Sequence, residues 1–235
     1  MLLDIRDIHC HYGALEAVRG VSIGVAEGTI VGLLGANGSG KSTTMRAVSG
    51  LMKPTQGEIW FNGRRIDGLP AHKVVSAGIT HVPEGRQLFP FMTVFDNLQL
   101  GAYSRKDKEG IKEDIEKLCE RYPILGKKKN RQASTLSGGE QAQLAIARAL
   151  MTKPKMLLLD EPLQGLSPII IGDVEEMVLE LNRGGMTVMM VEHNVHMTLS
   201  MSHKIYILGN GQVMMEGHPE ELSQTEYVQK VYLGR

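Results

Sequence analysis

Residues 35–42 have the types and spacing of a loop that binds nucleotide phosphates. They read Gly-Ala-Asn-Gly-Ser-Gly-Lys-Ser, which fits G-x-x-x-x-G-K-[ST]. Glycines let backbone N–H groups turn inward around phosphate oxygens, and a following helix start adds partial positive charge. Lys41 is predicted to reach the β- and γ-phosphates, and the Ser42 hydroxyl to take one place on Mg²⁺. An ordinary glycine-rich turn is the alternative, which the complete motif disfavours. The predicted nucleotide contacts are Gly35, Ala36, Asn37, Gly38, Ser39, Gly40, Lys41, Ser42 and Thr43.

Two further strand ends carry side chains that phosphate hydrolysis requires. Asp160 and Glu161 follow one apolar run, and His193 follows the next. In a doubly wound sheet such ends lie beside the phosphate loop. The Asp160 carboxylate is then placed to hold Mg²⁺ opposite Ser42, and Glu161 to act as general base on an attacking water. His193 is predicted to contact the γ-phosphate and orient that water. The alternative for each is an exposed strand-end side chain with no chemical role.

The elements that must position these groups alternate between strand and helix. Residues 29–34 form a short apolar run, and residues 43–49 are predicted to form a helix. Residues 155–160 and 187–191 are uninterrupted apolar runs, typical of strands buried on both faces of a parallel sheet. Between them, Ser167-Pro168 fits the N-cap and first turn of a helix. This order predicts an α/β fold with a parallel-sheet core.

The segments around this core differ in character. Residues 93–150 contain a predicted amphipathic helix, a basic loop at 126–131 that we interpret as a solvated connection, and a second helix. That second helix begins with a capping box from Ser137 to Glu140. We expect one domain, residues 1–235, in which 1–92 and 151–235 form the catalytic core with an N-terminal β subdomain and 93–150 form a helical lobe. Further strands are predicted at residues 2–8, 21–25 and 59–61 of the N-terminal part. Residues 204–208 and 212–216 are predicted to form a hairpin.

The composition excludes several classes of protein. Lys plus Arg and Asp plus Glu number 26 each, and this zero net charge disfavours a broad nucleic-acid surface. No apolar run approaches the ~18 residues of a membrane span, and an acidic residue comes too early for a secretory signal. Cys10 and Cys119 lack a C-x-x-C spacing and are expected to be buried thiols in a reducing cytosol. His9-Cys10-His11 is interpreted as coincidence and not as a metal site.

The stretch Leu136-Ser137-Gly138-Gly139-Glu140-Gln141 makes the pattern specific. With the phosphate loop before it and Asp160-Glu161 after it, the chain resembles the ATPase subunits of ABC transporters, and kinases and GTPases lack this signature. The resemblance covers the whole chain. It implies a P-loop NTPase fold with a RecA-like parallel core, an N-terminal antiparallel β subdomain and a helical signature lobe. It also implies that Ser137, Gly138 and Gly139 serve the γ-phosphate of ATP held by an opposite subunit.

The same resemblance implies roles for other single residues. Tyr12 falls where the family has an aromatic side chain that stacks on adenine, although its pattern fits a strand-end aromatic equally well. His193 falls at the family's switch histidine. Two positions depart from the family: Glu84 replaces the usual Gln of the γ-phosphate-sensing loop, and Ser167 replaces a common Asp in the dimer-contact loop. A carboxylate at Glu84 can hold a metal-bound water but cannot donate as an amide does.

Residues 82–98, 165–170 and 232–234 resemble the shorter ATPase subunit of branched-chain amino acid importers. This implies ATP hydrolysis with Mg²⁺ that powers uptake of branched-chain or related amino acids. The implied partners are a second ATPase subunit, alike or different, transmembrane permease subunits and, indirectly, a solute-binding protein, with no nucleic acid. The implied location is the cytoplasmic face of the cell membrane. Two alternatives remain: the ATPase of a lipid or polysaccharide exporter, and a soluble ABC ATPase outside transport, which usually carries a coiled-coil insertion or a second fused unit.

An apolar cluster lies within the segment from Glu84 to Leu98. Its members are Leu88, Phe89, Phe91 and Met92 around Pro90. We expect this cluster to receive a short helix from a transmembrane subunit, as in the importers that the chain resembles. The alternative is that the cluster packs into its own lobe.

Overall fold

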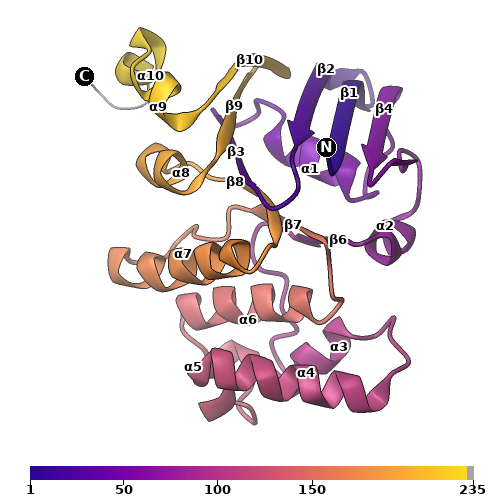
Figure 1. Ribbon diagram of the computed structural model, residues 1–235, viewed down its shortest axis with the longest axis vertical. Coiled ribbons are helices and arrows are strands. Elements are labelled where there is room, and N and C mark those ends of the chain that lie inside the picture. The colour runs from indigo at the N-terminus through magenta and orange to yellow at the C-terminus, as the bar shows by residue number, and fades with distance from the viewer. Residues whose placement is uncertain (232–235) are drawn as a thin grey trace.

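The computed structural model describes residues 1–231, with side chains at every position except 168, 169 and 231. Two β-sheets and a group of helices make up this part of the chain (Figure 1). Tyr232, Leu233 and Gly234, which contribute to the resemblance described above, lie outside the described residues.

The larger sheet has six strands in the order β10-β9-β3-β8-β7-β6. Five of them run parallel to one another, and the edge strand β10 is antiparallel to β9. Every residue of β3, β7 and β8 is buried, which confirms the prediction from their apolar runs. Because the strands are parallel, their carboxyl ends meet at one edge. The strands are β3 (Ile30–Gly35), β6 (Ile79–Val82), β7 (Met156–Asp160), β8 (Thr187–Val191), β9 (Lys204–Gly209) and β10 (Gln212–Gly217).

Helices cover both faces of this sheet. Along β7, Leu158 packs in a core cluster with Met45 of α1, whereas Leu157 and Leu159 pack in a second cluster with Val174 of α7. α1 begins at Lys41, two residues before the predicted start, and α7 begins after Ser167 as predicted, although this side chain makes no capping bond. The helices around the sheet are α1 (Lys41–Val48), α2 (Ala71–Ala77), α7 (Pro168–Arg183), α8 (Val195–Met201), α9 (Pro219–Ser223) and α10 (Glu226–Val231).

The smaller sheet is antiparallel, in the order β2-β1-β4-β5. β1 continues past the predicted residues 2–8 and ends at Tyr12, which pairs with Leu15 at the tip of a hairpin. In this extension His9 and His11 bond to Glu16 and Thr55, while Cys10 between them is buried, so the side chains alternate as in a strand. The strands are β1 (Leu3–Tyr12), β2 (Leu15–Val25), β4 (Gln56–Phe61) and β5 (Arg64–Arg65).

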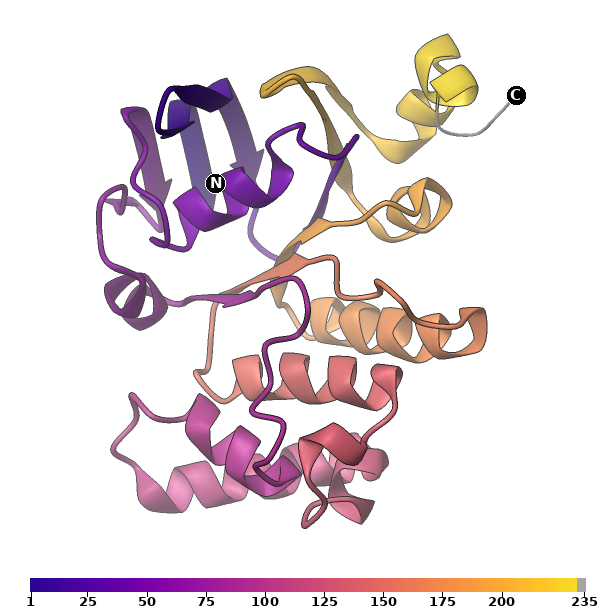
Figure 2. The same cartoon turned by 180° about the vertical axis from the view of Figure 1, so that it is seen from behind.

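The remaining helices gather at the end of the molecule away from the smaller sheet (Figures 1 and 2). The predicted capping box is present: Ser137 N donates to Glu140 Oε2 at 2.9 Å, and Glu140 N donates to Ser137 Oγ at 3.4 Å. None of the basic-loop residues 126–131 is buried, and Lys128 Nζ lies 2.7 Å from both oxygens of the same Glu140 carboxylate. The helices are α3 (Val94–Gly101), α4 (Lys108–Arg121), α5 (Pro123–Lys127), a 3₁₀ turn (Ala133–Thr135) and α6 (Gly138–Leu150).

Candidate active site

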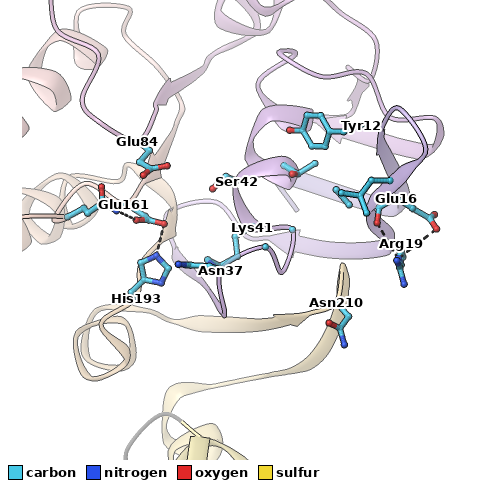
Figure 3. A pocket seen from close by; sticks show the side chains of 16 residues that line it. Tyr12, Glu16, Arg19, Asn37, Lys41, Ser42, Glu84, Glu161, His193 and Asn210 are labelled. Atoms are coloured by element: carbon cyan, nitrogen blue, oxygen red, sulfur yellow. Dashed lines mark hydrogen bonds and ion pairs between the residues drawn. The ribbon is translucent and has the colours of Figure 1, made fainter.

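A cavity of about 730 Å³ lies where β3 ends and α1 begins, a volume in the range of ligand pockets. Figure 3 shows Lys41 and Ser42 at its centre, Glu84, Glu161 and His193 on one side, and Tyr12 on the other. The structure therefore brings the predicted phosphate loop, acidic pair, histidine and aromatic residue to one place. The carboxyl ends of β3, β7 and β8 supply most of these groups.

The backbone of the phosphate loop requires glycine at its two ends. A Cβ on Gly40, whose φ is 101°, would lie 2.9 Å from the Ala17 carbonyl oxygen. A Cβ on Gly35 would overlap the carbonyl oxygen of Leu208. An L-residue at Gly40 would also be strained by that backbone angle. The Ser39 hydroxyl is buried and has no partner in the described part of the chain. This hydroxyl lies beside Gly35 and does not line the cavity.

The Lys41 ammonium is held within this loop. Its side chain is 5% exposed, and Nζ donates to the carbonyl oxygens of Gly35 at 2.8 Å and Ala36 at 3.0 Å. Burial lowers the pKa of Lys41, while the charges of Glu161 and Asp160 oppose that shift. A bound anion at the loop would stabilise the charged form of this buried ammonium. The position of Lys41 therefore fits the predicted contact with β- and γ-phosphates.

Ser42 and Asp160 form an oxygen pair at the same edge of the sheet. Ser42 Oγ donates to Asp160 Oδ1 at 3.1 Å, and Asp160 is 3% exposed. Burial raises the pKa of Asp160; the Ser42 hydrogen bond lowers it, and the nearby carboxylates of Glu161 and Glu84 raise it. A divalent cation would relieve this crowding of buried negative charge, and hydroxyl and carboxylate oxygens are ligands that Mg²⁺ prefers. The donor set thus fits the predicted metal, and Glu84 lies beside Glu161 on the same side of the cavity (Figure 3).

Glu161 and His193 meet at one side of the cavity. Glu161 Oε1 and His193 Nε2 lie 2.7 Å apart, and the Glu161 side chain is 8% exposed. Glu161 has φ 51°, an uncommon left-handed conformation for a residue with a side chain. Its N–H donates to the Val191 carbonyl at 3.0 Å, which anchors this turn to the end of β8. Strained conformations held by the surrounding structure often occur at functional positions.

Tyr12 lines the opposite end of the cavity. Its ring is 44% exposed, and its hydroxyl accepts a hydrogen bond from Arg46 Nη1 at 3.2 Å. The aromatic face is therefore available beside the phosphate loop, with its hydroxyl fixed by α1. Stacking on adenine stays a prediction.

The signature residues Ser137, Gly138 and Gly139 lie elsewhere. Among the described residues, none of these three lines the cavity around Lys41. They begin α6, where a Cβ on Gly139 would overlap the Ile170 side chain. The chain thus carries its phosphate loop and its signature at separate sites.

Sequence reasoning missed several residues around the site. The Asn210-Gly211 turn supports the phosphate loop, since Gly211 N donates to the Ser39 carbonyl at 3.2 Å. Glu192 is buried beside His193, and its Oε1 accepts from Leu163 N at 3.0 Å. Burial raises the pKa of Glu192 to about 7. The turn was recognisable from Asn-Gly alone, but its contact with residues far away in the chain was not.

Comparison with known proteins identifies the family. The profile described as "ABC transporter" matches residues 18–164. The chain belongs to the ABC transporter family. It is 40% identical over 233 residues to the high-affinity branched-chain amino acid transport ATP-binding protein BraG of Pseudomonas aeruginosa, covering 99% of this chain and 100% of BraG. It is 37% identical over 235 residues to the lipopolysaccharide export system ATP-binding protein LptB of Haemophilus influenzae, covering 99% and 97%.

A solved structure agrees with this assignment. The ADP conformation of MJ1267, an ATP-binding cassette of an ABC transporter, superposes with a TM-score of 0.89 at 30% identity and covers 100% of this chain and 99% of that one. The chain is therefore an ATP-binding ABC transporter ATPase, with the parallel core and antiparallel N-terminal sheet predicted from its sequence. Within the described residues no helix has the length and apolar character to cross a membrane.

Proposed function

We propose that this ATPase powers the uptake of branched-chain or related amino acids through separate transmembrane subunits at the cytoplasmic face of the cell membrane. The observation that carries this choice is the likeness to BraG over essentially the full length of both chains. The segments at 82–98 and 165–170, which resemble importer subunits, support the same choice. A solute-binding protein would deliver the amino acid to the transmembrane subunits.

Hydrolysis is assigned to residues that converge at the γ-phosphate end of the cavity. When adenine stacks on Tyr12 and residues 35–43 hold the phosphates, the γ-phosphate lies near Glu161 and His193. Glu161 takes a proton from the attacking water, and His193 orients that water against the γ-phosphate. Lys41 neutralises charge on the β- and γ-oxygens.

Metal binding is assigned to three oxygen-bearing side chains. Ser42 and Asp160 would hold Mg²⁺, and Glu84 would hold a water on it. When bound, the metal neutralises charge on the β- and γ-phosphates. Glu84 would accept hydrogen bonds from that water but, unlike an amide, would donate none.

We further propose that a second cassette completes the site. Ser137, Gly138 and Gly139 lie away from the cavity of their own chain, so they would bind ATP held by a partner cassette through the start of α6. One solved ABC transporter cassette, MJ0796, is dimeric with ADP and Pi bound. In the cell the partner would be a different ATPase subunit, and the isolated chain would form a homodimer with ATP. Residues 93–150 would act as a lobe that carries the signature relative to the core of 1–92 and 151–235.

A groove between β6 and the lobe helices α3 and α6 is the proposed contact with the transmembrane subunits. This cavity of about 500 Å³ is lined mainly by apolar side chains, among them Phe89, Leu100 and Tyr103. Phe89 is 47% exposed and Tyr103 is 86% exposed, whereas Leu88 packs against the lobe core. The predicted apolar cluster is therefore divided between the surface and the core. Asn97 holds Phe89 in place, since it accepts from Phe89 N at 3.0 Å and donates to its carbonyl at 3.1 Å.

Lipopolysaccharide export is a second candidate, because LptB matches over nearly the same length at 37% identity. Purification of the tagged chain from membranes, followed by mass spectrometry of its partners, separates the two functions. Importer subunits and ATP-dependent leucine uptake by membrane vesicles are expected. Recovery of lipopolysaccharide export subunits, with no leucine uptake, would overturn the proposal in favour of the second candidate.

A variant in the groove tests the docking surface. Phe89→Asp is expected to keep ATP binding and melting temperature but to lose the membrane partners. Docking would bury the new carboxylate in an apolar contact, which is unfavourable. Met214→Asp, at a 55% exposed position on β10, is the matched control. Normal assembly and transport by Phe89→Asp would remove the docking assignment, and unfolding would show that Phe89 is a core residue.

A further inference from the structure

Both carboxylate oxygens of Glu161 are engaged by neighbouring side chains. Oε1 pairs with His193 Nε2 at 2.7 Å, and Oε2 accepts a hydrogen bond from Gln164 Nε2, also at 2.7 Å. An attacking water must donate to this same carboxylate before it can lose a proton. Each hydrogen bond already in place takes one of the two lone pairs on its oxygen and restrains the orientation of the carboxylate toward that water. The proposed contact with the γ-phosphate explains His193, but it leaves Gln164 without a role.

A guanidinium group holds the backbone of Gln164. Arg86 Nη2 donates to the Gln164 carbonyl at 2.9 Å, and Arg86 Nη1 lies 3.3 Å from Gln141 Oε1 in α6. The backbone of Arg86 has φ 63°, a left-handed conformation that residues with a side chain rarely adopt. The segment after β6, the first turn of α6 and the loop after β7 therefore meet at one planar group. Arginine suits this position because its fork can bond two acceptors at once.

The same network extends to the docking groove. Arg148 Nη2 donates to the Arg86 carbonyl at 3.2 Å, and the Arg148 guanidinium lies 5.8 Å from the centre of the Phe89 ring. Phe89 and Arg148 both line the groove. A continuous series of contacts thus runs from the groove through Arg148, Arg86 and Gln164 to Glu161.

We propose that Gln164 is a positioning residue that restrains Glu161, and that Arg86 is the junction through which an occupant of the groove controls this restraint. The inference rests on the proposed role of Glu161 as general base. Displacement of Arg86 moves the Gln164 backbone, removes the hydrogen bond to Oε2 and lets the Glu161 carboxylate turn toward the attacking water. Gln164 lines the cavity beside Glu161, and within the described residues its side-chain amide bonds to Glu161 and not to the phosphate loop or the signature residues. Its main effect should therefore fall on turnover and not on nucleotide affinity.

Steady-state hydrolysis of Mg·ATP by the purified chain tests the restraint. Gln164→Leu keeps side-chain bulk and removes the donor, so kcat should rise by roughly threefold to tenfold, the effect of losing one net hydrogen bond. KM should stay within about twofold, since substrate binding is not altered. Gln99→Leu, at an exposed position of α3, is the control and should leave kcat unchanged. An unchanged or lower kcat in Gln164→Leu would overturn the proposal.

A double-mutant cycle tests the junction. Arg86→Met should raise kcat as Gln164→Leu does, and adding it to Gln164→Leu should have no further effect, because Arg86 acts through Gln164. Independent, multiplying effects would exclude this route. If Arg86→Met lowers the melting temperature too far, Arg86→Lys serves instead, since an ammonium lacks the fork that bridges both partners.

Side-chain NMR supplies a test that needs no turnover. The Gln164 amide resonance, assigned by its disappearance in Gln164→Leu, should shift in Glu161→Leu and in Arg86→Met but not in Gln99→Leu. An unshifted resonance in Glu161→Leu would show that the contact is absent in solution. Full hydrolysis by Glu161→Gln would instead refute the general-base role while leaving this contact measurable, so the two failures are distinct.

Discussion

Ser42 and Asp160, 118 positions apart in the chain, are joined by a hydrogen bond of 3.1 Å. Ser42 lies in the first turn of α1 after β3, and Asp160 ends β7, with β8 between the two strands in the sheet. Parallel strands bring their carboxyl ends to the same edge, so the hydroxyl and the carboxylate meet there. The fold thereby brings together two side chains, proposed here as metal ligands, that the chain keeps far apart.

Lys41→Ala should weaken ATP binding by roughly tenfold to a hundredfold or more, because a charge-assisted contact with the phosphates is lost. Fluorescence titration with ATP measures this loss, and the melting temperature should stay close to wild type. Lys73→Ala, at an exposed position of α2, is the control. Near-wild-type affinity in Lys41→Ala would remove Lys41 from the phosphate site.

Glu161→Gln should bind Mg·ATP as wild type does but hydrolyse it roughly a hundredfold to ten-thousandfold more slowly, the usual contribution of a general base. Gln keeps the shape of Glu and loses the basic oxygen. Phosphate release under saturating ATP is the measurement, with Glu120→Gln on the exposed face of α4 as control. Turnover within a few-fold of wild type would show that Glu161 is not the base.

Tyr12→Ala should weaken ATP by roughly tenfold while leaving inorganic triphosphate almost unaffected, because only ATP has a base to stack on the ring. Calorimetric titration with both ligands separates the two effects. Tyr12→Phe keeps the ring and loses only the bond to Arg46, so it should bind ATP nearly as wild type does. An equal loss of both ligands in Tyr12→Ala would make Tyr12 a packing residue.

ATP should convert Glu161→Gln from monomer to dimer on gel filtration, since bound ATP is retained between two cassettes. Adding Ser137→Arg should return the protein to monomer, because a bulky cation then occupies the start of α6 that faces the partner. Ser104→Arg, an exposed site on the same lobe, should leave the dimer intact. Persistence of the dimer with Ser137→Arg would place the interface elsewhere.

Glu192→Gln should stabilise the fold at pH 8. Burial raises the pKa of Glu192 from 4.5 to about 7, so the folded state holds a proton that the unfolded state releases. The stabilising effect of this proton is complete below pH ~4.5 and is lost as pH rises to about 7. The free energy of unfolding of the variant should therefore exceed that of wild type by about 3 kcal/mol at pH 8, and the two should be equal near pH 4.5. Denaturant unfolding across this range measures the difference, with Glu120→Gln as control; parallel profiles for wild type and Glu192→Gln would contradict the shift.

The sequence by itself determined the parts that depend on near neighbours. Residues 35–42 specify their loop through glycine conformation, and the Ser137–Glu140 capping box is closed by bonds between residues three apart. Uninterrupted apolar runs specified the buried strands β3, β7 and β8. These local rules also placed Asp160, Glu161 and His193 at strand ends. Because the strands are parallel, their carboxyl ends lie at one edge of the sheet, and the three side chains come close together there.

Only the tertiary structure decided which distant side chains touch. Nothing in the types or spacing of Arg86, Gln164 and Glu161 indicates that they share one network, nor that the Asn210-Gly211 turn supports the phosphate loop. Burial likewise set the raised pKa of Glu192, which reads in the sequence as one more strand-end acid. The physical reason is that such contacts depend on strand order, register and the packing of whole elements, whereas a sequence pattern reports only the preferences of residues a few positions apart.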